Sequence, residues 1–287
     1  MKNLSLNAPA KVNLTLEVLG KRPDGYHELK SVMQTIGLCD TLSLEPSSAI
    51  KYVCANPDWQ PDKSLLPKAV NLLRECSGTD KGAIINLTKN IPLVSGLGGE
   101  SSLAAAGLNG LNRLWGLDLS PPELEALAAK LGSDVPFFVR GGTALSQGRG
   151  EIITPLPPLP ESQLVLLVPE VPEIPQKTAR LYGCLNPGHY TKGEKTDRLV
   201  TCLKEGGQVP TDMLFNVFDE VAAEVFSGLG EYRQRFVSAG ARDVHLAGAG
   251  PAMFALYDTK NEAEAAHRRL AAQGLKGYRV AASGTFA

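Results

Sequence analysis

A glycine-rich loop followed directly by strong helix formers occupies residues 90–106, which read Asn-Ile-Pro-Leu-Val-Ser-Gly-Leu-Gly-Gly-Glu-Ser-Ser-Leu-Ala-Ala-Ala. The glycines at positions 96, 98 and 99 let the backbone turn tightly and come close to a ligand. Ser101 and Ser102 offer hydroxyl oxygens to the free amides of a helix that is predicted over 101–115. Because such amides and the helix dipole favour anions, the segment predicts a phosphate-binding loop. A loop that merely caps a helix is the alternative.

The loop matches neither of two common nucleotide-binding patterns. No lysine follows its last glycine, as the Walker pattern requires, and it fits the dinucleotide fingerprint poorly. The pattern of the loop alone therefore leaves the class of phosphate ligand open.

Composition narrows the class of protein. A chain of 287 residues makes one large or two medium domains. Its net charge of −1 provides no broad basic field for nucleic acid. The five cysteines are odd in number and have no CxxC spacing, which favours a reducing, cytoplasmic setting without a zinc site. No apolar run reaches about 18 residues and no signal-peptide pattern begins the chain, so we expect neither membrane insertion nor secretion.

The order of hydrophobic patterns predicts an α+β protein of two layers, with no internal repeat. Four prolines between positions 155 and 160 indicate a linker, so we expect domains over 1–155 and 156–287. The segments expected as strands are 4–8, 12–18, 41–45, 83–87, 163–169, 243–246, 253–256 and 278–281. The segments expected as helices are 66–76, 101–115, 120–131, 213–225, 232–239 and 261–273. Residues 184–198, rich in glycine, proline and lysine, are expected to form a mobile loop.

Three further segments identify the kind of phosphate chemistry. Residues 8–29 (Ala-Pro-Ala-Lys-Val-Asn to Gly-Tyr-His-Glu-Leu), 132–138 (Gly-Ser-Asp-Val-Pro-Phe-Phe) and 246–254 (Leu-Ala-Gly-Ala-Gly-Pro-Ala-Met-Phe) accompany the glycine loop in order. Together the four segments resemble the GHMP kinases along essentially the whole chain. The resemblance implies the two-domain GHMP kinase fold, with an ATP-binding first domain, a second domain that completes the substrate site, and the active site between them.

Two residues are candidates for catalysis. Asp134 stands between Gly-Ser and Val-Pro-Phe-Phe, where a carboxylate could accept the proton of an acceptor hydroxyl. Lys11 lies in an alternating strand, where its charge could stabilise the transition state. Local sequence alone favours a helix-capping aspartate and an edge-strand lysine. The resemblance implies instead that Lys11 and Asp134 form the catalytic pair.

The resemblance also implies two sets of ligand contacts. The glycine loop would bind ATP through Pro92, Leu93, Val94, Ser95, Gly96, Leu97, Gly98, Gly99, Glu100, Ser101 and Ser102. A cytidine-bearing substrate would be held by Asn13, Tyr26, His27, Lys177, Thr178, Tyr182, Gly248 and Gly250. In this set Tyr26 and His27 would hold the cytosine, Tyr182 would stack on it from the other side, and Asn13 would contact the erythritol. Judged alone, an adjacent tyrosine and histidine would more often be packing residues.

Five positions depart from the family pattern. Glu100 and Leu103 replace glycine and aspartate in the glycine loop, and Ala247, Ala249 and Ala252 replace hydroxyl residues in the third motif. A bare carboxylate about 4 Å from a phosphate oxygen costs roughly 4 kcal/mol at an effective dielectric constant of about 20. We therefore expect Glu100 to turn outward as an N-terminal acid of its helix, with coordination of Mg²⁺ as the alternative.

The resemblance implies ATP-dependent phosphorylation of the 2-hydroxyl of a cytidine diphosphate-linked methylerythritol, in the non-mevalonate route to isopentenyl diphosphate, with Mg²⁺ as the accompanying ion. No metal ligand and no oligomeric state is assigned. Two alternatives stay open. One is a GHMP kinase for another small alcohol. The other is a nucleotide-binding protein with weak catalysis, which the five altered positions favour.

Overall fold

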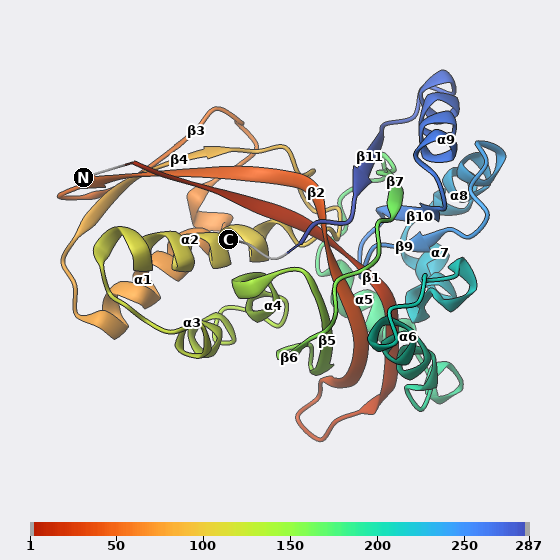
Figure 1. Cartoon of the computed structure of the whole chain (residues 1–287), viewed down its shortest axis with the longest axis horizontal. Helices are drawn as coiled ribbons and strands as arrows, with labels where there is room; N and C mark the ends of the chain where they lie inside the picture. Colours follow the sequence, from red (N-terminus) through yellow and green to blue (C-terminus); the bar gives the residue numbers. More distant parts are fainter. Residues whose placement is uncertain (1–2, 285–287) are drawn as a thin grey trace.

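The computed structural model describes residues 3–284, and these residues form two β-sheets, each covered by helices (Figure 1). The first sheet has the order β3-β4-β2-β1-β8, and β5 and β6 extend it from β2. Its strands are β1 (Leu4–Lys21), β2 (His27–Ser47), β3 (Ile50–Cys54), β4 (Gly82–Thr88), β5 (Thr143–Gly148), β6 (Ile152–Pro155) and β8 (Phe215–Asn216). The second sheet has the order β11-β7-β10-β9. Its strands are β7 (Gln163–Leu167), β9 (His245–Leu246), β10 (Met253–Tyr257) and β11 (Gly277–Ala281).

Helices from the first half of the chain cover one face of the first sheet (Figure 1). They are α1 (Leu65–Ser77), α2 (Gly99–Trp115), α3 (Pro121–Ala128) and α4 (Val135–Arg140), with the short 3₁₀ turn η1 (Pro61–Lys63) before them. Helix α1 shows why these segments form: Ser64 caps it by accepting from Leu66 N, Gly78 ends it in a left-handed conformation, and its apolar residues fall on one buried face.

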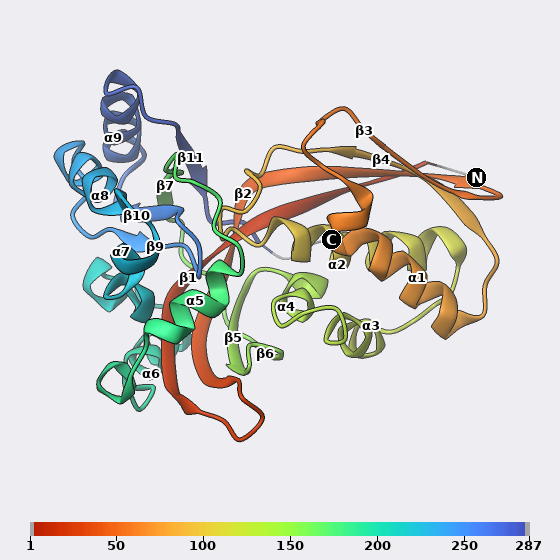
Figure 2. The same cartoon turned by 180° about the vertical axis from the view of Figure 1, so that it is seen from behind.

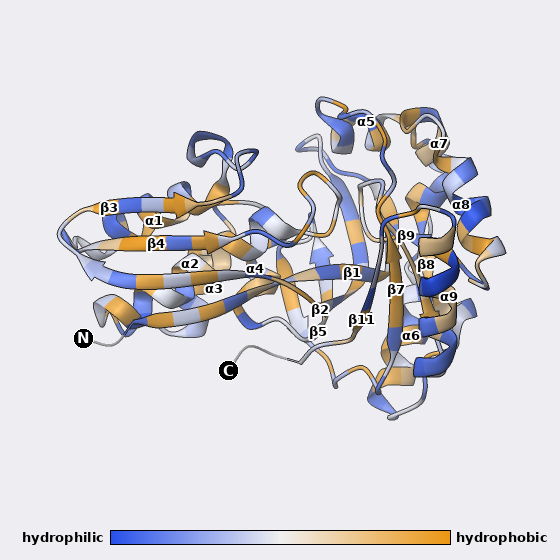
Figure 3. Ribbon diagram, turned by 90° about the horizontal axis from the view of Figure 1, so that it is seen from above, coloured by the Kyte–Doolittle hydropathy of each residue, from blue (hydrophilic) through white to orange (hydrophobic). Residues whose placement is uncertain are grey.

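Helices from the second half surround the second sheet and the far end of β1 (Figures 1 and 2). They are α5 (Lys177–Cys184), α6 (Glu194–Lys204), α7 (Ala222–Val225), α8 (Leu229–Ser238) and α9 (Lys260–Ala272), with the 3₁₀ turns η2 (Pro187–His189), η3 (Thr211–Met213) and η4 (Val217–Asp219). Strand β7, which reads Gln-Leu-Val-Leu-Leu, is almost continuously apolar (Figure 3). Both of its neighbours, β10 and β11, run antiparallel to it.

Strand β1 connects the two halves. It pairs with β2 along its length and with β8 at Thr15 and Leu16. Every residue from Ala8 to Val18 is buried, and the apolar side chains enter different clusters: Ala8 packs with the first half of the chain, whereas Leu16 and Val18 pack with the second. A third apolar cluster contains residues of β1, β2, β7 and α6 and so joins the two sheets.

Most predicted elements are confirmed within a few residues, but the strands expected over 4–8 and 12–18 are one continuous strand, β1, and 41–45 is the last part of the longer β2. Two further predictions are wrong. Residues 213–225 do not form one helix, because Asn216 enters β8 and its side chain accepts from Phe218 N, a local bond that competes with a helix. Residues 184–198 are not one loop, since η2 and the start of α6 lie within them. The carboxylate of Glu17 accepts from Thr196 N at 2.7 Å and so caps α6 from a distant strand. The division after residue 155 stays a prediction.

Across residues 3–284, no helix combines the length and the apolar character needed to cross a bilayer.

Candidate active site

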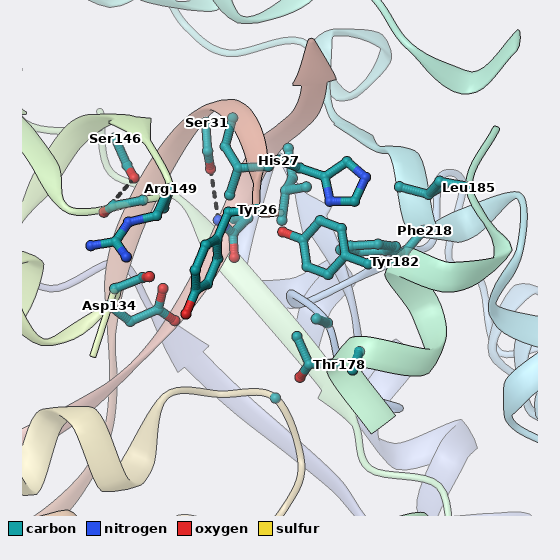
Figure 4. Close-up of a pocket in the computed structure, with 18 of the residues that line it drawn as sticks. Tyr26, His27, Ser31, Asp134, Ser146, Arg149, Thr178, Tyr182, Leu185 and Phe218 are labelled. Carbon is teal, nitrogen blue, oxygen red and sulfur yellow. Dashed lines mark hydrogen bonds between the residues drawn. The ribbon is translucent and has the colours of Figure 1, made fainter. Parts of the chain in front are cut away.

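A cavity of about 920 Å³ collects most of the predicted substrate and catalytic residues (Figure 4). Strands β1 and β2, the glycine loop, the start of α4 and helix α5 all contribute to its wall. Of the predicted residues it is lined by Lys11, Asn13, Tyr26, His27, Asp134, Lys177, Thr178 and Tyr182, together with Gly96 and Gly98 of the loop. Gly248 and Gly250 do not line it, but Ala249 between them does.

Lys11 and Asp134 meet in this cavity. Lys11 Nζ lies 3.5 Å from Asp134 Oδ2, and the Lys11 side chain is only 5% exposed whereas that of Asp134 is 39% exposed. Asp134 is the N-cap residue of α4, yet its side chain makes no capping hydrogen bond. The prediction that its carboxylate serves the helix is therefore not supported, and the carboxylate is left available to a ligand beside a buried ammonium group.

A chain of buried hydrogen bonds fixes the position of Lys11. Lys11 Nζ donates to Asn13 Oδ1 at 2.6 Å, and Asn13 Nδ2 donates to Ser31 Oγ at 2.7 Å. Ser31 Oγ in turn donates to Thr15 O at 2.6 Å. Each of these buried polar groups has a hydrogen-bond partner. The chain therefore holds the Lys11 ammonium toward the cavity without leaving any of them unsatisfied.

The glycine loop forms a small cavity of its own, of about 160 Å³, at the start of α2. Every predicted ATP-binding residue from Pro92 to Ser101 lines it, and so does Lys89. Gly96 (φ 91°) and Gly98 (φ 76°) adopt left-handed conformations, and so does Val94 (φ 57°), where a β-branched residue is strained. The loop therefore directs the first amides of α2 toward a space of phosphate size.

The third motif, residues 246–254, packs against this loop. A Cβ atom on Gly250 would lie 2.5 Å from Gly96 Cα, and one on Gly248 would lie 2.7 Å from Lys11 Nζ. Gly250 is therefore required where the motif approaches the loop backbone, and a side chain at position 248 would have to displace the Lys11 ammonium. Sequence reasoning expected direct substrate contacts from Gly248 and Gly250, but the structure shows them packed against the loop and Lys11.

Ser102 departs from the prediction. Helix α2 begins at Gly99 with Gly98 as its N-cap and without a side-chain cap, so neither Ser101 nor Ser102 caps it. Ser102 lies outside the loop cavity, and its hydroxyl is buried without a hydrogen-bond partner among residues 3–284. The helix starts two residues earlier than expected, which rotates Ser102 onto another face.

Glu100 does not turn outward to solvent. Its Oε2 accepts from Ser64 Oγ at 2.5 Å and from Leu65 N at 3.1 Å, so it adds a carboxylate to the N-terminus of α1. Such an acid is favourable at a helix start. The partner lies in a neighbouring helix that is distant in sequence, which is why local reasoning did not find it.

Replacing Glu100 with alanine is expected to lower the free energy of unfolding by about 1–3 kcal/mol, because Leu65 N and Ser64 Oγ lose a charged partner. Denaturant unfolding measures this, with Glu75→Ala on the exposed face of α1 as control. The Mg²⁺ concentration for half-maximal turnover should not change. A large increase in that concentration would instead identify Glu100 as a metal ligand.

His27, Tyr182 and Phe218 gather on one side of the large cavity, and Tyr26 lies between them and Asp134 (Figure 4). His27 stacks on Tyr182 with ring centroids 4.8 Å apart and planes at 19°, and Phe218 meets Tyr182 edge-on at 5.0 Å. Tyr26 is 55% exposed, and the Arg149 guanidinium lies 4.9 Å from its ring centroid. The contact between His27 and Tyr182 was not predicted, and at this separation the two rings leave no space for a base between them.

Burial lowers the pKa of His27, and the charge of Lys21 acts in the same direction. The imidazole is therefore neutral near pH 7 and offers one donor and one acceptor. Among the lining residues of this cavity that sequence reasoning missed are Ser31, Ser146, Arg149, Tyr190 and Phe218. The sequence contained one signal for a polar site at this strand. Polar residues alternate with apolar ones along β1, which proves to be buried; they are Lys11, Asn13, Thr15 and Glu17.

Lys177 reaches across to the glycine loop, where its Nζ donates to Val94 O. Burial lowers its pKa to about 8, the Lys11 ammonium adds to the effect, and Glu173 opposes it. Lys177 is therefore charged below about pH 8 and neutral above it.

Affinity for CDP is expected to fall as the pH rises from 7 to 9, because Lys177 loses its charge while the phosphate, with a second pKa of about 6, stays fully ionised. Titration calorimetry across this range measures the effect. In Lys177→Met the affinity should be weaker throughout and nearly independent of pH. If CDP affinity still fell with rising pH in this variant, the effect could not be assigned to the charge of Lys177.

Comparisons with known proteins agree with this geometry. The family GHMP kinases N terminal domain matches residues 64–142, and GHMP kinases C terminal matches residues 199–276. The 4-diphosphocytidyl-2-C-methyl-D-erythritol kinase of Dehalococcoides mccartyi is 48% identical over 281 residues, 98% of this chain and 99% of that protein. Its counterpart in Geobacter metallireducens is 41% identical over 270 residues, 93% of each chain.

Solved structures show the same relationship. A crystal structure of a 4-(cytidine 5'-diphospho)-2C-methyl-D-erythritol kinase has a TM-score of 0.82 at 33% identity and covers 98% of this chain and 100% of its own. Homoserine kinase from Cytophaga hutchinsonii shares the fold, with a TM-score of 0.76 at 19% identity over 99% and 96% of the two chains. The resemblance and the α+β fold predicted from the motifs are thus confirmed. The chain belongs to the GHMP kinases, and the relatives of 41–48% identity reported above are 4-diphosphocytidyl-2-C-methyl-D-erythritol kinases.

Proposed function

We propose that the protein transfers the γ-phosphoryl group of ATP to the 2-hydroxyl of 4-diphosphocytidyl-2-C-methyl-D-erythritol. The observation that carries the proposal is that one cavity of about 920 Å³ contains both the Lys11–Asp134 pair and the aromatic cluster around Tyr182. A substrate with a sugar alcohol at one end and a nucleobase at the other fits such a cavity. Relatives of 38–48% identity carry the name of this kinase, which supports the same assignment.

The acceptor hydroxyl would lie beside Asp134. Its oxygen attacks the γ-phosphorus, the bond from that phosphorus to the β–γ bridging oxygen breaks, and ADP leaves. Asp134 takes the hydroxyl proton, and the Lys11 ammonium stabilises the charge that develops on the transferring group. The 3.5 Å separation of Lys11 Nζ and Asp134 Oδ2 allows both groups to reach one reacting centre.

The nucleotide would enter from the glycine loop. Its phosphates would occupy the loop cavity at the start of α2, and its nucleoside would lie in an adjoining cavity of about 660 Å³ that shares Leu93, Val94, Ser95 and Glu100 with the loop. Residues 3–284 contain no group of three or more acidic, histidine or cysteine side chains that could hold a metal. Mg²⁺ would therefore arrive on the ATP phosphates, which is how this ion is commonly bound.

The cytosine would contact Tyr26, His27 and Tyr182. Replacing His27 or Tyr182 with alanine is expected to weaken CDP about ten-fold or more, because base–aromatic stacking contributes about 1–3 kcal/mol per base. ATP affinity should change little. Titration calorimetry with CDP measures the effect, with His267→Ala on α9, outside the cavity lining, as the histidine control. Unchanged CDP affinity in both variants would favour a kinase for another small alcohol.

A coupled assay for ADP release tests the proposal directly. With ATP, Mg²⁺ and the cytidylated substrate, turnover should be substrate-dependent, and the product should carry phosphate on the 2-hydroxyl. Turnover with homoserine or mevalonate but not with the cytidylated alcohol would contradict the substrate assignment. Tight ATP binding without turnover on any alcohol would indicate the nucleotide-binding alternative.

We expect the reaction to take place in the cytoplasm. All five cysteines are free thiols in the structure, as suits a reducing compartment.

A further inference from the structure

Lys177 lies where the cavities of the candidate active site meet. Among residues 3–284, it alone lines both the large cavity, which contains Lys11 and Asp134, and the adjoining cavity in which we place the nucleoside of ATP. The loop cavity shares Val94 with the nucleoside cavity and Gly96 with the large cavity. A phosphate chain that runs from the nucleoside cavity through the loop toward Asp134 therefore passes beside Lys177.

A backbone oxygen of the glycine loop holds the Lys177 ammonium at this place. Lys177 Nζ donates to Val94 O, and an ammonium group has three N–H donors, so two remain for a ligand. Val94 (φ 57°) and Gln176 (φ 54°), which precedes Lys177, both adopt left-handed backbone conformations that are unfavourable for residues other than glycine. Unfavourable backbone geometry of this kind concentrates at sites that hold ligands.

The partner of Lys177 differs from the partners of the other two lysines beside the loop. Lys11 lies 3.5 Å from Asp134 Oδ2, and Lys89 pairs with the fully buried Asp40. Lys177 donates instead to a neutral carbonyl, which does not compensate its positive charge. The Lys11 ammonium is near enough to lower the pKa of Lys177, and an anion bound beside both groups would offset this repulsion.

We infer that Lys177 is a third catalytic group, whose ammonium binds a non-bridging oxygen of the γ-phosphate of ATP. This inference rests on the proposed kinase function. Lys177 would keep its bond to Val94 O and donate a second N–H to the phosphate. The bond from the γ-phosphorus to ADP breaks while the bond to the acceptor oxygen forms, and the hydroxyl proton passes to Asp134. Lys177 exchanges no proton, but stabilises negative charge on the transferring group.

This role extends the contact with the cytidylated substrate that sequence reasoning expected for Lys177. A residue that only held that substrate would change its affinity and leave nucleotide binding as it is. A ligand of the γ-phosphate distinguishes ATP from ADP, even when no acceptor is bound. The two roles can therefore be separated by measurement.

Titration calorimetry with nucleotides alone tests the inference. The two ligands are Mg²⁺-ADP and the non-hydrolysable analogue Mg²⁺-AMP-PNP, which differ by the γ-phosphate. In Lys177→Gln the affinity for AMP-PNP should fall about ten-fold or more, because a hydrogen bond between charged groups is lost, whereas the affinity for ADP should stay within about two-fold. The glutamine amide can still donate to Val94 O, so the variant keeps a donor for the loop.

Two further variants control for changes in structure. Arg180→Gln removes an exposed cation of α5 outside all three cavity linings and should bind both nucleotides as the wild type does. Lys177→Arg keeps the positive charge and should recover part of the affinity for AMP-PNP. Equal losses for ADP and AMP-PNP in Lys177→Gln, or unchanged affinity for both, would overturn the proposal.

Turnover measures the catalytic part of the role. With the cytidylated substrate, Lys177→Gln should lower kcat by about 10²-fold or more, the range found when one preorganised donor to developing charge is removed. A higher KM for that substrate with unchanged kcat would overturn the catalytic role and leave Lys177 as a ligand of the acceptor alone. The nucleotide titrations need no acceptor, so they decide the inference even where the substrate assignment fails.

Discussion

Asp134→Asn is expected to lower kcat by about 10²–10⁴-fold, the usual contribution of a general base. The asparagine keeps the size of the side chain and its place before α4, but it cannot accept the hydroxyl proton. Because the Asp134 side chain makes no capping bond and is 39% exposed, the variant should still fold, although the Lys11 ammonium loses its counter-ion 3.5 Å away. Affinity for ATP should stay within a few-fold, since the loop cavity does not include this residue.

Single-turnover kinetics with the cytidylated substrate measure this loss apart from product release. Asp80→Asn, an exposed aspartate after α1, is the matched control and should retain full activity. A folded Asp134→Asn protein with near-normal turnover would remove Asp134 from the mechanism and leave it as a residue that merely begins a helix.

Lys11→Met is expected to lower kcat by about 10²–10³-fold, the range measured when one preorganised donor to developing charge is removed. The methionine fills much of the same buried volume next to Gly98, but it leaves Asn13 Oδ1 without its 2.6 Å donor. The loss should therefore be mainly in kcat, with a smaller change in KM for the substrate that Asn13 adjoins.

A second lysine on the neighbouring strand provides the control. Lys30 pairs with Asp197 at 2.7 Å and lies outside the cavity lining, so Lys30→Met should leave kcat within about two-fold. The double variant Lys11→Met/Asp134→Asn should be little worse than either single variant, because the two groups act on one reacting centre. Full additivity of the two losses would show that they act independently.

Local patterns in the sequence predicted the parts of the site that are local in the fold. Residues from Pro92 to Ser101 surround one small cavity because a turn, a glycine run and a helix start are encoded within ten neighbouring positions. The same reasoning misplaced Ser102 because one or two residues of error in a helix start rotate a side chain to another face.

Contacts between distant segments could not be predicted from patterns. The juxtaposition of Lys11 with Asp134 was expected only from the family resemblance, and no periodicity encodes it. The stack of His27 on Tyr182 and the capping of α1 by Glu100 depend on how separate elements pack. Asn216 is similar: its Nδ2 donates to Leu246 O at 2.9 Å and Gly248 O at 3.1 Å, and these bonds replaced the helix expected over 213–225.

The long strand β1 imposes an order of assembly on the newly made chain. Thr15 and Leu16 emerge from the ribosome some 200 residues before their strand partners, Phe215 and Asn216. At about 5–20 residues per second this interval is roughly 10–40 s. During that time Leu16 and Val18 lack the apolar neighbours that bury them in the finished protein. We therefore expect chains released early, before β8, to be retained by chaperones or to aggregate.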